Sequence, residues 1–499
     1  MIAAVEQPLL VAIALAAVVV ASAWVAKRSR IPTPVFFVVA GLLFSFVPGV
    51  QEIRLPPDVV FYGFLPPLLY AAAFVVSPRE ARENWASILV LAVGLTAATL
   101  LTVGFVGWAL VPALGAGGAF LLGAVLGPTD PVSATTVIGQ TSAPERLQTI
   151  LEGESLVNDG VGLVAFSIAL TAVRHGSFSV GDGIVKFLYV SAGGIVFGIA
   201  VAWIVERIRT RVHDAEIEIP LSVLTPYVAY IPAERLHLSG ILATVACGVY
   251  LGWRSGGIFR AEVRLQSIAF WDALEFILTA VLFVLLGTQF RPVLHRLDHP
   301  GVVDPLVVFG VLTIVRLAWM FTVPYLVHRW REIAPWQDRF VLGWSGMRGA
   351  LSLAAALSIP AAVAQREQVL YLTFTTILAG LAVLALPLPW LLERLGFAGP
   401  AEDAAERQAR IAVLRAALTR LDELGVDDDH GVRRLYETRL ERVARSDDST
   451  IDEHVDLRRE LLGAERTELQ QLERDGKLTY AAARRLERQL DLEETGLRR

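Results

Sequence analysis

A run of polar residues interrupts an apolar segment near the first third of the chain. The run, residues 154–159, reads Glu-Ser-Leu-Val-Asn-Asp, and the apolar segment extends from about Leu147 to Val173, enough to span a membrane. Asp159 lies about 18 Å along a helix from Leu147, near the middle of a hydrocarbon layer roughly 30 Å thick. Charged groups at that depth are costly and usually mark ion paths, proton relays or buried pairs.

The polar side chains of this run suit a small cation. On a helix, Glu154, Ser155, Asn158 and Asp159 fall within an arc of about 140° and can line one cavity. Asp159 offers a titratable carboxylate, and Ser155 offers a hydroxyl oxygen one turn away. Such oxygen ligands favour Na⁺, with K⁺ as the second choice, over a transition metal. A buried carboxylate that binds either the cation or a proton is the minimal exchanger.

The composition indicates that membrane helices position this run. Of the 499 residues, 54% are hydrophobic and only 19% are charged, an apolar excess that is not typical of soluble domains. Apolar segments of about 20 residues alternate with short charged loops, as in polytopic membrane proteins. We predict about thirteen transmembrane helices, beginning near Pro8, Ile31, Asp58, Trp85, Gly118, Leu147, Gly183, Ile217, Leu238, Ile268, Pro305, Arg339 and Gln368.

The eighth span is the least regular, because Pro220, Pro226 and Pro232 interrupt it. With thirteen spans, fifteen basic loop residues lie on one side and seven on the other, and the basic side is expected to be cytoplasmic. This asymmetry predicts a multi-pass protein of the cell (inner) membrane with its N-terminus outside and its C-terminus in the cytoplasm. The first apolar segment lacks a basic leader and is interpreted as a span rather than a signal peptide.

The last hundred residues differ from the rest in composition. From about Ala401 the chain is rich in Arg, Glu, Asp, Leu and Ala, with apolar residues such as Leu414, Leu418 and Leu421 at helical spacing. We therefore predict a transmembrane domain over residues 1–396 and a cytoplasmic helical domain over residues 397–499. Charged faces of this kind are usually solvated surface, and a regulatory or dimer-contact role is the alternative.

Two of the predicted spans contain breaks in matching positions. The fifth span contains Gly-Pro-Thr-Asp-Pro at residues 127–131, and the twelfth contains Gly-Trp-Ser-Gly-Met-Arg-Gly at residues 343–349. If spans 1–6 and 8–13 form two inverted repeats, the two broken spans correspond, which is the pattern of a transporter's midplane site. We expect crossed half-helices, with Asp130 near their positive N-terminal ends and Arg348 near their negative C-terminal ends.

Glu154 requires a partner, because a second free carboxylate would repel Asp159. The eleventh span supplies Arg316 in apolar surroundings, and a Glu154–Arg316 ion pair would cancel both charges and orient Asn158. Asp272 and Glu275, near the inner end of the tenth span, line an entrance in one interpretation and are solvated or paired in the other. The single cysteine, Cys247, excludes a disulfide within the chain.

These segments resemble the monovalent cation/proton antiporter family, which includes NhaP-type proteins and sodium/proton exchangers. The resemblance rests on residues 64–70, 127–132, 152–159 and 346–350 together with Arg316, in family order across about residues 8–395. It implies the antiporter fold, a homodimer, and electroneutral exchange by an elevator-like alternating-access motion. By position it assigns the following roles: Asp159 as exchanging carboxylate, Thr129 and Ser155 as cation ligands, Asn158 as an orienting residue, Glu154–Arg316 as a structural pair, and Asp130 and Arg348 as compensating charges.

One position departs from the family pattern. Several members have an acid directly after the segment that corresponds to residues 64–70, whereas this chain has Ala71. The cation site therefore has one fewer anionic ligand, unless Glu275 or water replaces it. Asp159 becomes correspondingly more important.

The expected substrates are Na⁺ or K⁺ and H⁺, the protein's surroundings are the lipid bilayer, and neither a cofactor nor nucleic acid is expected. The main alternative is a cation channel or a non-transporting sensor on the same scaffold. An organic-solute symporter would need a larger, more aromatic pocket. An intramembrane aspartyl protease built on Asp130 and Asp159 would need Gly-X-Gly-Asp and Tyr-Asp contexts, which these acids lack.

Overall fold

The computed structural model is helical, with no β-strand in the residues that it describes. Those residues are 2–29, 31–47, 58–175, 180–211, 214–258, 261–289, 301, 303–326, 335–397, 404–423, 432–445, 461–465, 467–469, 471, 486 and 490. The chain forms two compact units, Met1–Ala401 and Glu402–Arg499. The predicted all-α class is therefore confirmed.

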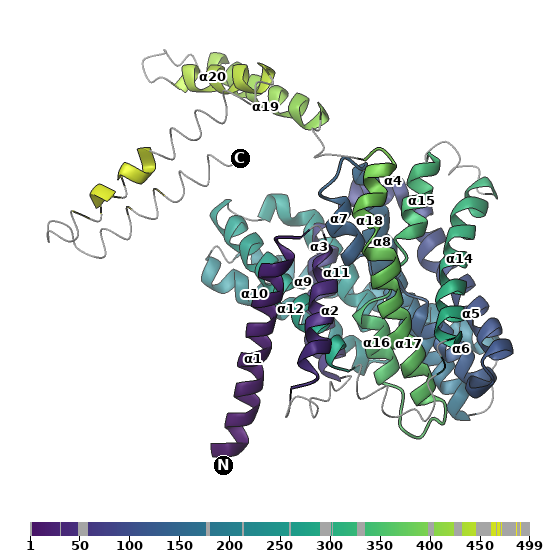
Figure 1. Ribbon diagram of the computed structural model, residues 1–499. Helices are drawn as coiled ribbons and strands as arrows, with labels where there is room; N and C mark the ends of the chain where they lie inside the picture. Colours follow the sequence, from purple (N-terminus) through teal and green to yellow (C-terminus); the bar gives the residue numbers. More distant parts are fainter. Residues whose placement is uncertain are drawn as a thin grey trace. The chain divides into compact units, whose positions relative to one another are not determined.

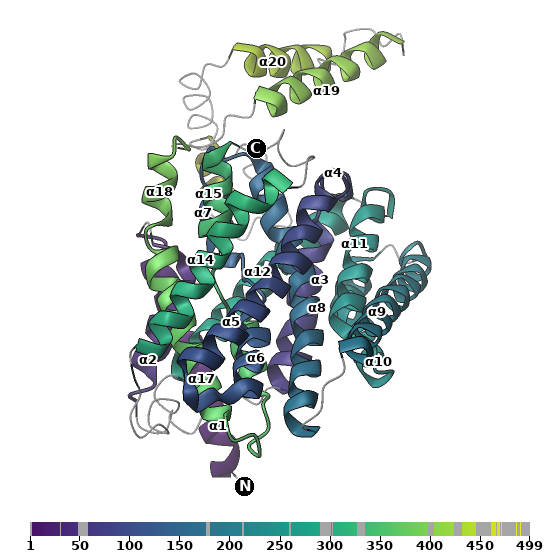
Figure 2. The same ribbon diagram turned by 90° about the vertical axis from the view of Figure 1, so that its right-hand side faces the viewer.

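One group of helices in the larger unit surrounds α11 (Gly240–Ile258), and we call it the α11 group. In it, α11 packs against α3 (Leu65–Val75), α9 (Val180–Arg209) and α10 (Ala215–Arg235). Figure 2 shows α9, α10 and α11 side by side. The other members are α2 (Thr33–Phe44) and its two neighbours, α1 (Ile2–Ala26) and α12 (Ala261–Thr288). A π-helical segment, η2 (Val59–Phe64), leads into α3.

A second group, which we call the α8 group, is built around α8 (Glu145–His175). This helix contains the polar run of residues 154–159, and it packs against α4 and α6. Figure 1 shows α5 and α6 side by side in the same group. The other members pack against one another around it. The group comprises α4 (Pro78–Leu89), η3 (Val90–Leu95), α5 (Thr96–Leu110), η4 (Pro112–Leu114), α6 (Gly115–Leu126), α7 (Val132–Ile138), α14 (Val303–Leu326), α15 (Trp336–Trp344), α16 (Ala350–Leu357), α17 (Arg366–Gly380), η6 (Leu381–Ala385) and α18 (Leu388–Arg394).

Both predicted helix breaks are present. The first separates α6 from α7, where Pro128 and Pro131 have no N–H to donate to a continuing helix. The second separates α15 from α16. The breaks touch, because the backbone N–H of Asp130 donates to the carbonyl of Met347 at 2.9 Å. The predicted crossing of two broken helices is therefore confirmed.

Each of the thirteen expected spans coincides with a helix or a broken helix among the described residues. Six are long and apolar enough by themselves to cross a membrane, namely those within 81–110, 145–174, 185–209, 263–288, 303–323 and 366–394. Others are shorter, so the count of thirteen stays a prediction. The eighth segment differs from expectation, because α10 is one continuous helix with Pro220, Pro226 and Pro232 inside it.

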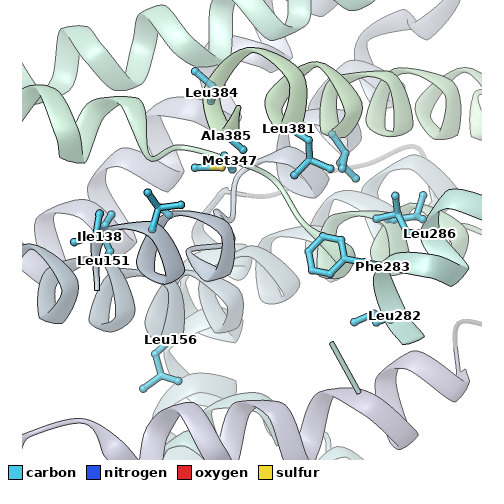
Figure 3. Close-up of a cluster of buried hydrophobic side chains, with 14 of the residues drawn as sticks. Ile138, Leu151, Leu156, Leu282, Phe283, Leu286, Met347, Leu381, Leu384 and Ala385 are labelled. Atoms are coloured by element: carbon cyan, nitrogen blue, oxygen red, sulfur yellow. The ribbon is translucent and has the colours of Figure 1, made fainter. Parts of the chain in front are cut away.

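Apolar side chains surround the crossing and join the two groups into one unit. Met347, in the second break, is 1% exposed and lies beside residues of η6 (Figure 3). The same buried cluster includes side chains from α7, α8 and α12, so it reaches across both groups. Its labelled members in Figure 3 are Ile138, Leu151, Leu156, Leu282, Phe283, Leu286, Met347, Leu381, Leu384 and Ala385.

The smaller unit contains α19 (Ala404–Glu423) and α20 (Val432–Arg445), which pack against each other. An ion pair between Arg433 and Asp422 links them. Where side-chain burial is described, most side chains of both helices are exposed, as the charged composition predicts. Most of the later part of the predicted helical domain, residues 446–499, lies outside the described residues.

Candidate functional site

A cavity of about 150 Å³ lies between the two helix groups of the larger unit. The α11 group contributes residues of α3 and α12 to its wall, and the α8 group contributes residues of α8, α16 and the first break. Much of the wall is leucine, proline and phenylalanine. Its polar and charged residues are Thr129, Asp130, Glu152, Ser155, Asp159, Glu275, Thr279 and Ser352.

Asp159 reaches this cavity from the middle of α8. Glu152, Ser155 and Asp159 follow one another at spacings of three and four residues, so they form a stripe on one face of the helix. In the part of the chain that the structure describes, no basic side chain forms an ion pair with Asp159. Its carboxylate therefore lines the cavity with no ion-pair partner among the described residues.

Glu154 points away from the stripe and pairs with Arg316 of α14. Both residues are buried, at 1% and 2% exposure. Arg316 donates from Nη1 to Oε1 at 2.6 Å and from Nη2 to Oε2 at 2.8 Å, and its Nε donates to the carbonyl of Leu342 at 3.0 Å. A two-pronged geometry of this kind is the strong form of a carboxylate–guanidinium contact. The two charges therefore satisfy each other inside the α8 group.

A hydrogen-bond chain connects this ion pair to the first break. The Thr129 hydroxyl donates to Glu154 Oε1 at 3.1 Å, and it accepts from Asn158 Nδ2 at 2.8 Å. Asn158 is fully buried, and its Oδ1 has no hydrogen-bond partner among the described residues. Thr129 and Asn158 are thus tied to Glu154, and the Thr129 hydroxyl keeps one lone pair for another contact.

Opposite charges lie at opposite ends of the crossed half-helices. Arg348 is buried and donates from Nη1 to the carbonyls of Gly127 and Pro128, each at 2.6 Å, at the C-terminal end of α6. Asp130 Oδ1 accepts from the backbone N–H of Val132 at 3.0 Å, at the N-terminal end of α7. Each charge opposes the local helix dipole. Asp130 and Arg348 are the two residues predicted to be compensating charges, and that role stays a prediction.

Glycine makes this crossing sterically feasible. A Cβ at Gly349, just before α16, would lie 1.6 Å from Asp130 Oδ2, and a Cβ at Gly346 would lie 2.2 Å from Arg316 Cδ. Side chains at either position would displace these charged groups. The Asp130 carboxylate therefore also lies at the N-terminal end of α16.

Most of the residues singled out in the sequence meet at this place. Ser155, Asp159, Thr129 and Asp130 line the cavity, whereas Asn158, Glu154 and Arg316 form the layer behind them. Arg348 lies at the crossing. Glu275 lines the cavity, and Asp272 is exposed outside its wall.

Three polar residues of the wall were not singled out from the sequence, namely Glu152, Thr279 and Ser352. Glu152 precedes Ser155 by three residues, so helical spacing alone signals it. Ser352 lies in the first turn of the half-helix after the second break. The predicted inverted repeats make this break the counterpart of the first one, so its polar residues are candidates for the site. Thr279 carries no such signal, because its place depends on how α12 packs.

Residues 13–394 match the family described as "Sodium/hydrogen exchanger, transmembrane". The chain belongs to this family. It is a multi-pass membrane protein of a family of cation/proton antiporters, as the resemblance of its motifs predicts. The family's activity is transport rather than an enzymatic reaction.

Known relatives and structures agree with this assignment. An uncharacterized Na⁺/H⁺ exchanger of Mycobacterium tuberculosis is 32% identical, with 98% of this chain and 96% of the relative covered. A sodium, potassium, lithium and rubidium/H⁺ antiporter of Bacillus subtilis is 30% identical over 73% of this chain and 58% of the relative. The sodium proton antiporter MjNhaP1 of Methanocaldococcus jannaschii has a similar fold, with a TM-score of 0.61 and 20% identity over 78% of this chain and 99% of that one.

Proposed function

We propose that this protein exchanges Na⁺ for H⁺ across the cell membrane and that Asp159 binds the two ions in turn. The ion that moves down its gradient then drives the other ion in the opposite direction. One carboxylate that exchanges one cation for one proton makes the cycle electroneutral. K⁺ is the second candidate cation, and the name of the Bacillus subtilis relative supports a broad choice of alkali cations.

The single observation that carries this proposal is that the other buried charges have protein partners and Asp159 does not have an ion-pair partner among the described residues. Glu154, Arg316 and Arg348 have close protein partners, whereas Asp159 faces the cavity with no ion pair among the described residues. An uncompensated carboxylate in a small, mostly apolar cavity is stable when it binds a proton or a cation. Both occupants neutralise it, and each excludes the other.

The neighbouring oxygens complete a cation site. Ser155 supplies its hydroxyl from the same stripe of α8, and Thr129 supplies its backbone carbonyl, because Glu154 and Asn158 engage its hydroxyl. Hard oxygen ligands of this kind suit Na⁺. Asn158 orients the site through Thr129, and the Glu154–Arg316 pair holds Asn158 and Thr129 in place.

The division into two groups supports alternating access. The cavity lies between the α11 group and the α8 group, and Asp159 belongs to the latter. Sliding of the α8 group against the α11 group would expose Asp159 to each side in turn, as in an elevator. The family resemblance supports a homodimer. We place the protein in the inner membrane, with the N-terminus outside and the domain of residues 397–499 in the cytoplasm.

Proteoliposomes that contain a pH-sensitive dye test the exchange. Addition of Na⁺, K⁺ or Li⁺ outside should alkalinise the lumen, because each cation that enters is exchanged for a proton that leaves, and choline should have no effect. Asp159→Asn should abolish this proton flux. Glu216→Gln removes an exposed acid of α10 and should leave the flux at the wild-type level. An imposed membrane potential should not change the rate, because the exchange is electroneutral.

Two results would overturn the proposal. Proton flux in Asp159→Asn equal to that of the wild type would show that Asp159 is not the exchanging group. A cation current without coupled proton movement would favour a channel on the same scaffold.

A further inference from the structure

The geometry points to Ser352 as an additional cation ligand, one that sets the affinity for Na⁺ in a site lacking the acid at position 71. This inference rests on the proposed exchange at Asp159 and names a residue that completes the same site. Ser352 lies in the first turn of α16, beyond the second helix break, and it shares the cavity wall with Asp159 and Ser155.

Ser352 is almost entirely buried, yet it borders the cavity. Its exposed fraction is 3%. It also lies near Pro128 and Gly162, which border a space too narrow for a water molecule, and Gly162 lies one helical turn beyond Asp159 on α8. The residues that line these two spaces with Ser352 place it between the first break and the part of α8 that contains Asp159.

The Ser352 hydroxyl has unused capacity as a ligand. Buried hydroxyls in helices commonly donate to a carbonyl three or four residues earlier, as Thr225 and Thr244 do here. Within the described part of the chain, the Ser352 hydroxyl forms no such bond. A hydroxyl at the wall of a cavity with polar wall residues takes its partner from the contents of that cavity. A cation in the cavity would supply one.

The charge around Ser352 is compatible with a cation. A serine in the first turn of a helix lies near the positive end of the dipole, which repels cations. Asp130 offsets this effect, because its carboxylate lies against the start of α16 at Gly349. Arg348, the nearest positive charge in the sequence, directs Nη1 to the carbonyls of Gly127 and Pro128.

The ligand count also favours this role. The family acid is replaced by Ala71, which is buried, and the wall residue next to it is Ala72. The Thr129 hydroxyl is engaged elsewhere. Na⁺ takes several oxygen ligands. The ligands proposed so far are Asp159, Ser155 and the Thr129 carbonyl, which do not complete its coordination shell. Ser352 adds an oxygen from a third segment of the α8 group, which would move together with Asp159.

The test measures the half-saturating concentration of Na⁺ and the maximal rate of exchange in proteoliposomes. Ser352→Ala should raise the half-saturating Na⁺ concentration about three- to tenfold, the loss expected for one oxygen contact, with little change in the maximal rate. Ser352→Thr keeps the hydroxyl and should restore most of the affinity. Ser358→Ala is the matched control, because the Ser358 hydroxyl donates to the Ala355 carbonyl at the other end of α16.

A binding measurement separates affinity from folding. In detergent, Na⁺ should raise the melting temperature of Ser352→Ala less than that of the wild type, whereas without Na⁺ the two should melt alike. An unchanged half-saturating concentration in Ser352→Ala, or equal effects of Ser352→Ala and Ser358→Ala, would overturn the inference. If Asp159→Asn is inactive in the same assay, the proposed exchange still stands; if Asp159→Asn is active, the exchange proposal itself fails.

Discussion

The Arg316 guanidinium contacts both carboxylate oxygens of Glu154, at 2.6 and 2.8 Å, inside the α8 group. Glu154 lies five residues before Asp159 on the same helix, yet the two acids have different surroundings. Arg316 neutralises Glu154, whereas Asp159 lines the cavity. These two acids of α8 thus differ, because Glu154 is held in an ion pair and Asp159 has none among the described residues.

Removal of one member of this pair should destabilise the protein more than removal of both. Glu154→Gln leaves a buried guanidinium unpaired, and Arg316→Ala leaves a buried carboxylate unpaired, each at a cost of about 3–5 kcal/mol. The double variant removes both charges and should recover part of the loss. Melting temperatures in detergent of the wild type, both single variants and the double variant form the cycle.

A double variant as unstable as the two single losses added together would count against direct pairing. Transport activity alone does not decide this question, because the pair also orients Thr129 and Asn158.

Gly349→Ala should disrupt the crossing. The new Cβ would lie 1.6 Å from Asp130 Oδ2. Asp130 cannot move freely, because its Oδ1 accepts a hydrogen bond from the backbone N–H of Val132. We expect loss of exchange together with a lower melting temperature. The control is Gly310→Ala on α14, where a Cβ would meet nothing within 4 Å. Normal exchange by Gly349→Ala would contradict the close approach of Asp130 and Gly349.

Much of the site could be predicted from the sequence, because its signals are local. Two prolines within five residues require a helix break, and an apolar run around Asp159 places a carboxylate at membrane depth. The pairing of Glu154 with Arg316 followed from the rule that buried charges need partners. Proline breaks helices, and buried charges need partners, in any membrane fold.

Other features depend on packing and could not be predicted in the same way. Thr279 reaches the cavity because α12 lies opposite α8, which no local pattern reveals. The engagement of the Thr129 hydroxyl depends on two side chains more than twenty residues away. The continuity of α10 through three prolines was also unexpected, since proline removes a backbone donor but neighbouring helices in a membrane protein tolerate the defect.

Arg348→Lys should weaken the protein less than Arg348→Gln. The positive charge opposes the C-terminal end of α6 at the Gly127 and Pro128 carbonyls, and lysine retains that charge as a single point. We expect intermediate stability and activity for lysine and near-complete loss for glutamine. Arg235→Lys, at an exposed position on α10, is the control. Equal damage from lysine and glutamine would indicate that hydrogen-bond geometry, rather than charge, is what matters.

The half-saturating Na⁺ concentration should depend on pH. If a proton and Na⁺ compete for Asp159, each unit of acidification in the range where Asp159 is protonated should raise that concentration up to about tenfold. More alkaline solution should lower it until it reaches a constant value. Rates measured in proteoliposomes at several pH values, with equal pH on both sides, give this relation. A half-saturating concentration that stays constant in acid would show that the two ions bind at separate places.

Proton release upon Na⁺ binding tests the shared carboxylate most directly. Purified protein in weakly buffered detergent solution, at a pH where Asp159 is protonated, should release close to one proton for each Na⁺ bound. Choline should release none, and Asp159→Asn should release none. Na⁺ binding without proton release in the wild type, or the same release from Asp159→Asn, would contradict the exchange of Na⁺ and H⁺ on Asp159.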